Sequence, residues 1–206
     1  KQDVIHWPNR FRGVSEDDKA LVTVDGVDIR IEEPQPFTEG WFSQKFKGPG
    51  VRYEVALSIV GGEIVWTNGP FPCGMWNDLS IFRFGLKNKL MDGEVVVADK
   101  GYIGDERVLP PKYVTDKILR ARHETVNRRL KHWACMRNAW RHDTDKHILA
   151  FNAVATITQI ELVGGSPLFD PFPVVERKLA RMRLREALGE HLDRVMEADP
   201  NDSRTT

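Results

Sequence analysis

The sequence predicts an α/β protein with a mixed sheet flanked by helices. Three strand patterns come first along the chain, and a fourth follows the first helix pattern. Two longer helix patterns complete the order strand, hairpin, helix, strand, helix, helix, which is typical of helices packed on a sheet. The sequence has neither a GxGxxG segment after a strand nor a GxxxxGK[ST] segment, so it supports neither a dinucleotide-binding fold nor a P-loop.

The strand patterns are short and rich in β-branched residues. The first covers 21–31 (LVTVDGVDIRI), where apolar and polar residues alternate. Residues 53–60 and 63–68 flank two consecutive glycines, the spacing of a β-hairpin. A short apolar strand, 94–98, is followed directly by Asp99. These segments predict the strands of one sheet.

Three helices are expected where apolar residues recur at helical spacing. The first covers 78–90, and either Asn77 or Asp78 is suited to cap its N-terminus. The second spans about 115–137. The third begins near Asp145 and continues through the apolar segment ILAFNAVATITQIEL.

Changes in composition and a Pro-rich break predict that the chain has three parts. Residues 1–20 are polar and acidic and are expected to be a lead-in segment. Residues 21–165 hold all the strand patterns and are expected to form the main domain. Residues 166–206 begin with a Pro-rich break, continue as a charged amphipathic helix over 174–196, and end in a polar tail that we expect to be disordered.

Composition excludes several classes of protein. Hydrophobic residues make up 41%, enough for a core, but no apolar run approaches the roughly 20 residues of a membrane span. The N-terminal residues lack the apolar region of a signal peptide, so we expect an intracellular protein. Cys73 and Cys135 are the only cysteines and lie 62 positions apart, which excludes a disulfide framework and argues against a cysteine zinc site.

Carboxylates at the ends of elements are candidate metal ligands. Asp25 lies in the first strand beside Gly26, which allows close approach of another group. Asp99 follows the strand 94–98, and Glu124 lies in the second helix. Mg²⁺ prefers oxygen ligands and keeps several waters, so two or three carboxylates suffice. Each acid alone also suits a simpler role, as a turn former or a solvated ion-pair partner, and alternation places Asp28 on the opposite face from Asp25.

Basic residues surround Glu124 in the sequence. Residues 112–146 contain ten Lys or Arg against four Asp or Glu, although the whole chain has 30 of each. This excess predicts a phosphate-binding face around the acid, and a solvated helix surface is the alternative. The candidate DNA-binding residues are Arg120, Arg122, Asn127, Arg128 and Lys131.

Several stretches, in order, resemble one family. They are VDGVDIRI around Asp25, GEIVWTNGPFPCGMWNDLSIF, VVADKGYIG around Asp99, RARHETVNRRLKHW around Glu124, and KHILAFNAVATITQIELVGGSPLFD. Over roughly residues 1–173 the sequence resembles the DDE endonuclease domain of PIF/Harbinger-type transposases. It departs from the family pattern in having DGVD where DGTH is usual, so that Asp28 replaces a histidine, and in the short 25-residue gap between the second and third acids.

The resemblance implies an RNase H-like fold and a metal-dependent nuclease. Asp25, Asp99 and Glu124 would be the catalytic triad and would bind two divalent ions, Mg²⁺ or alternatively Mn²⁺, which activate the attacking oxygen and stabilise the leaving oxygen. Strand cleavage at transposon ends and strand transfer would follow. The implied setting is the nucleus, with DNA, a separate Myb-like DNA-binding protein and a second copy of the chain as partners, and no membrane. Two alternatives stay open: a domesticated or inactive DNA-binding or interaction module, and a general RNase H-like nuclease.

Overall fold

The computed structural model describes residues 4–16, 18–109 and 114–173. The chain divides into two compact units, 1–169 and 170–206, and the second is described only over 170–173. The amphipathic helix predicted over 174–196 therefore lies outside the described residues. Everything that follows concerns the first unit.

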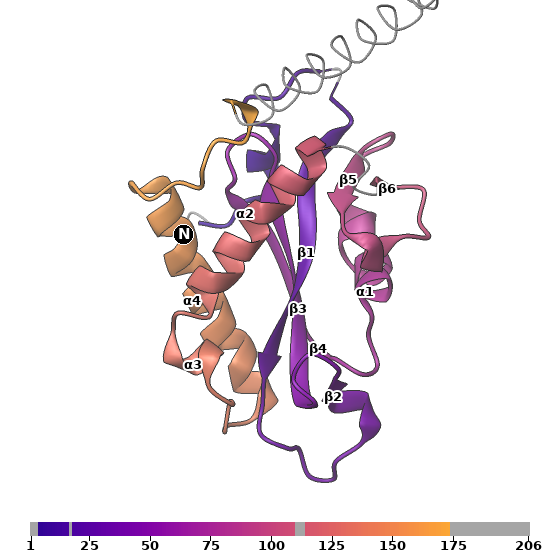
Figure 1. Ribbon diagram of the computed structural model, residues 1–206, viewed down its shortest axis with the longest axis vertical. Helices are drawn as coiled ribbons and strands as arrows, with labels where there is room; N and C mark the ends of the chain where they lie inside the picture. The colour runs from indigo at the N-terminus through magenta and orange to yellow at the C-terminus, as the bar shows by residue number, and fades with distance from the viewer. Residues whose placement is uncertain (1–3, 17, 110–113, 174–206) are drawn as a thin grey trace, which may run out of the picture. The chain divides into compact units, whose positions relative to one another are not determined.

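A mixed sheet forms the centre of this unit (Figure 1). The described strands run in the order β2-β3-β1-β5-β6, and β4 also pairs with β3. Their bounds are β1 Ala20–Arg30, β2 Phe42–Ser43, β3 Gly48–Ser58, β4 Ile64–Pro72, β5 Val95–Ala98 and β6 Val108–Leu109. The antiparallel β3–β1 pair adjoins the parallel β1–β5 and β5–β6 pairs, which confirms the predicted mixed sheet. Strands β2 and β6 have no counterpart among the predicted strands.

Helices cover both faces of the sheet. Figure 1 shows α2, α3 and α4 on one side of the central strands and α1 on the other. The helical segments are η1 Trp7–Phe11, η2 Glu39–Trp41, α1 Asp78–Phe84, η3 Leu86–Lys89, η4 Lys100–Tyr102, α2 Val114–Leu130, α3 Ala134–Arg137 and α4 Thr144–Val163. Among the described residues, none of these helices is both long and apolar enough to span a membrane.

Two predicted helices are shorter than their patterns suggested. The helix expected over 78–90 breaks at Gly85, whose backbone is not helical (φ −116°, ψ −85°) and where an added Cβ would meet the side-chain amide of Asn68. The helix expected over 115–137 ends at Leu130, and α3 begins after Trp133, whose backbone is extended (φ −70°, ψ 131°). In both cases the apolar residues keep their helical spacing beyond the end of the helix, because the residues after the turn still face the core. The pattern therefore predicted too long a helix.

Two apolar clusters divide between the faces of β1. Val27 and Ile29 point toward the helices α2 and α4 and belong to a cluster with Leu130 and Phe151. Side chains along a strand point alternately to its two faces, so Val22 and Val24 belong to the other cluster, with Phe82 of α1 and Tyr102. The strand β1 is thus buried on both faces, which positions its polar residues firmly.

The segment predicted as a lead-in contributes buried contacts. Arg10 of η1 forms an ion pair with Glu94 at 2.9 Å, and both side chains are at most 4% exposed. Trp7 packs edge-on against Trp66 of β4, with ring centroids 6.1 Å apart. The short helix η1 therefore packs against the rest of the unit through Trp7 and Arg10.

Candidate active site

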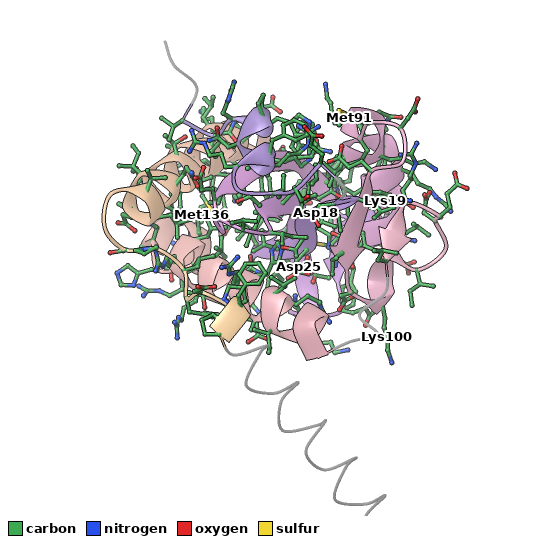
Figure 2. The ribbon with its side chains drawn as sticks, turned by 90° about the horizontal axis from the view of Figure 1, so that it is seen from above. Asp18, Lys19, Asp25, Met91, Lys100 and Met136 are labelled. Atoms are coloured by element: carbon green, nitrogen blue, oxygen red, sulfur yellow. The ribbon has the colours of Figure 1, made fainter. Side chains whose placement is uncertain are left out.

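The two predicted aspartates lie at the same level of the sheet. Val24 pairs with Ala98 at the last step of the parallel ladder between β1 and β5. Asp25 and Asp99 follow that pair on strands whose spacing is about 4.8 Å. Figure 2 labels Asp25 near the middle of the ribbon and Lys100, the neighbour of Asp99, nearer its edge. The register therefore brings together two acids that are 74 positions apart in the sequence.

Backbone amides orient both carboxylates. The N–H of Gly26 donates to Asp25 Oδ1 at 2.9 Å. Asp99 caps the short helix η4, and its Oδ1 accepts from the N–H of Gly101 at 2.5 Å. Each acid is thus held by a glycine one or two residues further along the chain.

Helix α2 supplies the remaining neighbours of the acids. Arg120 Nη2 lies 2.8 Å from Asp99 Oδ2, and Asn127 Nδ2 donates to Asp25 Oδ2 at 3.3 Å. Glu124 lies between Arg120 and Asn127 on the same helical face. Its side chain is exposed and makes no hydrogen bond or ion pair with the described residues. The structure therefore brings Asp25 and Asp99 together, whereas Glu124, although it lies on the α2 face of Arg120 and Asn127, does not complete a group of three acids among the described residues.

A third aspartate, Asp78 at the start of α1, joins this group. Arg52 of β3 links it to Asp28: Arg52 Nη1 lies 3.1 Å from Asp78, and Arg52 Nε donates to Asp28 at 2.6 Å. Burial raises the pKa of Asp78, and the charges of Asp25, Asp28 and Asp99 raise it further, while Arg52 opposes them. For the more deeply buried Asp28, the hydrogen bonds and charge of Arg52 outweigh burial, and its pKa lies below its usual value.

The electrostatic environment of Asp25 is that of a partly buried acid. Burial raises the pKa of its carboxyl, and the nearby Asp99 carboxylate adds to this effect. The N–H of Gly26 and the charges of Lys45 and Arg120 act in the opposite direction. Ionised carboxylates held close together in a low-dielectric site repel each other, and a bound cation relieves this repulsion.

A family model supports the reading of this geometry. The model for DDE superfamily endonucleases matches residues 24–159, which is more than half of the chain and includes Asp25, Asp78, Asp99 and Glu124. The chain belongs to the DDE superfamily endonucleases. Membership in this family suggests a transposase-type nuclease. The comparisons with curated proteins and with solved structures gave no match.

The basic residues predicted to contact DNA have different environments in this DDE endonuclease. Arg128 is exposed on α2. Lys131 is half-buried; its Nζ lies 5.7 Å from the centre of the Phe46 ring, and burial together with the charge of Lys45 lowers its pKa. Arg122 is 3% exposed, and its Nη1 donates to the backbone oxygen of Ile59 at 2.6 Å. Arg128 and Lys131 are therefore the members of this set best placed to meet a phosphate.

The neighbour of Glu124 in the sequence, His123, faces inward. It is 1% exposed, and its Nε2 lies 2.8 Å from the hydroxyl of Thr23 on β1. Burial lowers its pKa to about 3, so the ring is neutral at physiological pH. This contact joins α2 to the central strand and thereby sets the height of Glu124 above the sheet.

The donor chemistry of the DDE site suits a hard divalent cation. The carboxylates of Asp25, Asp78 and Asp99 offer only oxygen ligands, which Mg²⁺ prefers. Over the part of the chain that the structure describes, however, no group of three or more His, Cys, Asp or Glu side chains stands close enough together to hold a metal ion. Asp99 is instead paired with Arg120, and Asp25 accepts from Asn127.

Sequence reasoning did not identify Asp78 and Arg52 as parts of the site. Asp78 was considered as a helix cap, but Asn77 is the cap: its side chain accepts from the N–H of Ser80. Arg52 lies in β3 and stands in none of the stretches that resemble the family. A usable signal was present for Asp78, because it stands in one of the stretches that resemble the family.

Proposed function

We propose that the protein is a metal-dependent DNA endonuclease and transposase of PIF/Harbinger type, which cuts and joins phosphodiesters at transposon ends. The observation that carries the proposal is the pair Asp25 and Asp99 on neighbouring parallel strands, facing the helix of Glu124. The family match supports endonuclease chemistry. The strand order β4-β3-β1-β5-β6, with an acid in the central strand, supports an RNase H-like fold.

In this proposal Asp25, Asp99 and Glu124 hold two divalent ions, Mg²⁺ or Mn²⁺. Such ions, when bound, activate water or a 3′-hydroxyl and stabilise the leaving oxygen of a phosphodiester. Asn127 and the N–H of Gly26 orient Asp25 for this role. Arg120 pairs with Asp99 and, if Asp99 held a cation, would be free to contact a DNA phosphate.

DNA would bind along the face of α2 that surrounds the acids. Arg128 is exposed there, and Lys131 forms no ion pair with the described residues. Lys45 lies near Lys131 and lines a cavity of about 1160 Å³ that also reaches Asp28 and Arg52. This cavity provides space for a DNA strand that extends away from the proposed catalytic acids. A Myb-like partner, a homodimer that pairs two transposon ends, and a nuclear location complete the proposal.

Thermal unfolding with and without Mg²⁺ or Mn²⁺ tests the metal site. We expect divalent ions to raise the Tm of the wild type, because a ligand that binds only the folded state stabilises it. The shift should vanish in Asp99→Ala and persist in Asp145→Asn, which changes an exposed acid at the start of α4. Nicking of supercoiled plasmid should follow the same pattern.

The same experiment separates the proposal from its alternative. A wild-type protein that shows no metal shift and no nicking, yet binds DNA, would be an inactive DNA-binding module. A metal shift that survives Asp99→Ala would place the ions elsewhere and would refute the assigned site. Loss of both in Asp99→Ala and Asp25→Asn, with Asp145→Asn unchanged, supports Asp25 and Asp99 as metal ligands.

A further inference from the structure

We propose that Asp78 is a positioning residue: its carboxylate is wedged between Gly26 and Gly101 and sets the distance between Asp25 and Asp99. The inference rests on the roles proposed above for these two acids. It assigns to Asp78 a task that neither the family match nor the predicted triad contains.

The need for such a residue follows from the register of the sheet. The ladder between β1 and β5 ends at the pair Val24 and Ala98. Beyond that pair β1 continues to Arg30, whereas the chain after β5 turns into η4. The paired part of the ladder thus ends immediately before the two acids, and a further contact can fix the spacing of Asp25 from Asp99.

Asp78 makes this contact on both sides. A Cβ at Gly26 would lie 2.6 Å from Asp78 Oδ1, and a Cβ at Gly101 would lie 2.7 Å from Asp78 Oδ2. The two oxygens of one carboxylate thus rest against the backbones of both glycines. These are the glycines whose N–H groups hold Asp25 and Asp99. A shift of Asp78 would accordingly move both hydrogen-bonded pairs.

Arg52 and Asp28 keep Asp78 in place. Arg52 donates to both oxygens of Asp28, at 2.6 and 3.1 Å, and contacts Asp78 through its remaining nitrogen at 3.1 Å. Asp28 is 1% exposed and also accepts from Ser43 at 3.1 Å, so the guanidinium has a rigid anchor. The planar fork of arginine suits this bridging of two carboxylates.

The wedge explains why both neighbouring positions are glycine. Neither Gly26 nor Gly101 has a positive φ, so the backbone conformation at each position is open to alanine. The close approach of the Asp78 oxygens is what an added methyl group would disturb. The glycine one or two positions after each proposed catalytic acid is thus favoured by the contact with Asp78 rather than by a turn.

A double-mutant cycle in the metal-free protein directly tests the contact between Asp78 and Gly101. Gly101→Ala should lower the Tm by about 5 °C in the wild type, because the methyl group meets the Asp78 carboxylate. In an Asp78→Ala background the same change should leave the Tm unchanged or raise it, since alanine restricts the unfolded chain more than glycine does. An equal loss in both backgrounds would overturn the proposal.

Metal dependence tests the consequence for the site. Asp78→Ala should raise the Mg²⁺ concentration for half-maximal nicking at least tenfold. Asp78→Asn, which keeps the size of the side chain and an oxygen within reach of Arg52, should restore most of the affinity. Arg83→Gln is the control, because it removes an ion pair with Asp105 near the other end of α1.

The outcomes separate this inference from the proposed function. If Asp78→Asn impairs Mg²⁺ dependence as much as Asp78→Ala, the carboxylate acts as a ligand and the positioning role is wrong. If the wild type shows no response to Mg²⁺, the metal role of Asp25 and Asp99 fails. The alanine cycle, which needs no metal, would still decide whether Asp78 spaces the two acids.

Discussion

Glu54 makes the stability of the protein depend on pH in a direction that can be worked out from its surroundings. It lies on β3 opposite Gly26 and is 0% exposed. One oxygen accepts from Trp66 Nε1 at 3.3 Å, and the other has no hydrogen-bond partner among the described residues. Burial, with a smaller contribution from the charge of Asp78, raises the pKa of Glu54 from 4.5 to about 8.

A raised pKa favours the folded state at low pH. Below pH 4.5 the carboxyl is protonated in both states, and between 4.5 and about 8 only the unfolded state ionises. Each pH unit in that window therefore costs the folded state about 1.4 kcal/mol. The free energy of unfolding should fall by about 3 kcal/mol between pH 5 and pH 7.5 because of this single group.

The substitution Glu54→Gln isolates this effect. Its amide oxygen can still accept from Trp66, and the side chain no longer titrates. We expect Glu54→Gln to be more stable than the wild type by about 4 kcal/mol at pH 7.5 and by about 1 kcal/mol at pH 5. Urea unfolding at the two pH values measures both differences.

An exposed carboxyl provides the control for that experiment. Glu33→Gln removes a titratable group of the same kind from the surface and should leave the difference between pH 5 and pH 7.5 close to that of the wild type. If Glu54→Gln and the wild type lose stability in parallel between the two pH values, Glu54 is ionised in the folded protein and the reasoning is refuted.

Three further substitutions have defined outcomes. Glu94→Ala leaves Arg10 charged, buried and unpaired, and should lower the free energy of unfolding by about 3–5 kcal/mol; a loss below about 1 kcal/mol in urea unfolding would contradict this. Leu130→Ala, in the core beneath α2, should cost about 2–5 kcal/mol by the same measurement. Arg128→Ala combined with Lys131→Ala should weaken DNA binding and reduce the slope of log K against log [salt] by about 2; an unchanged slope would count against the proposed groove.

Local patterns predicted most of the elements correctly. The strand patterns at 21–31 and 94–98 appear as β1 and β5, because β-branched residues that alternate or are buried on both faces mark strands in one short window. Helix ends were predicted less well. The end of α2 at Leu130 depends on how Trp133 packs after the turn, and this is not visible in helical spacing.

The candidate site shows the same division. Asp25, Asp99 and Glu124 could be named from the sequence because each stands in a stretch that resembles the family. Asp78 and Arg52 were not assigned to the site, since their significance lies in contacts with residues 23 to 52 positions away. Arg122, predicted to contact DNA, is buried against backbone carbonyls, which its charge alone does not reveal.

The amino-acid sequence by itself determined the class of fold and the DDE family and offered three candidate acids, because these depend on periodicity and on the order of short motifs. Only the tertiary structure decided that Asp25 and Asp99 follow the last pair of a parallel ladder, and that Asp78 reaches between their glycines. Strand register and the path of a helix are set by the packing of whole faces, so distant residues meet only once the sheet has formed.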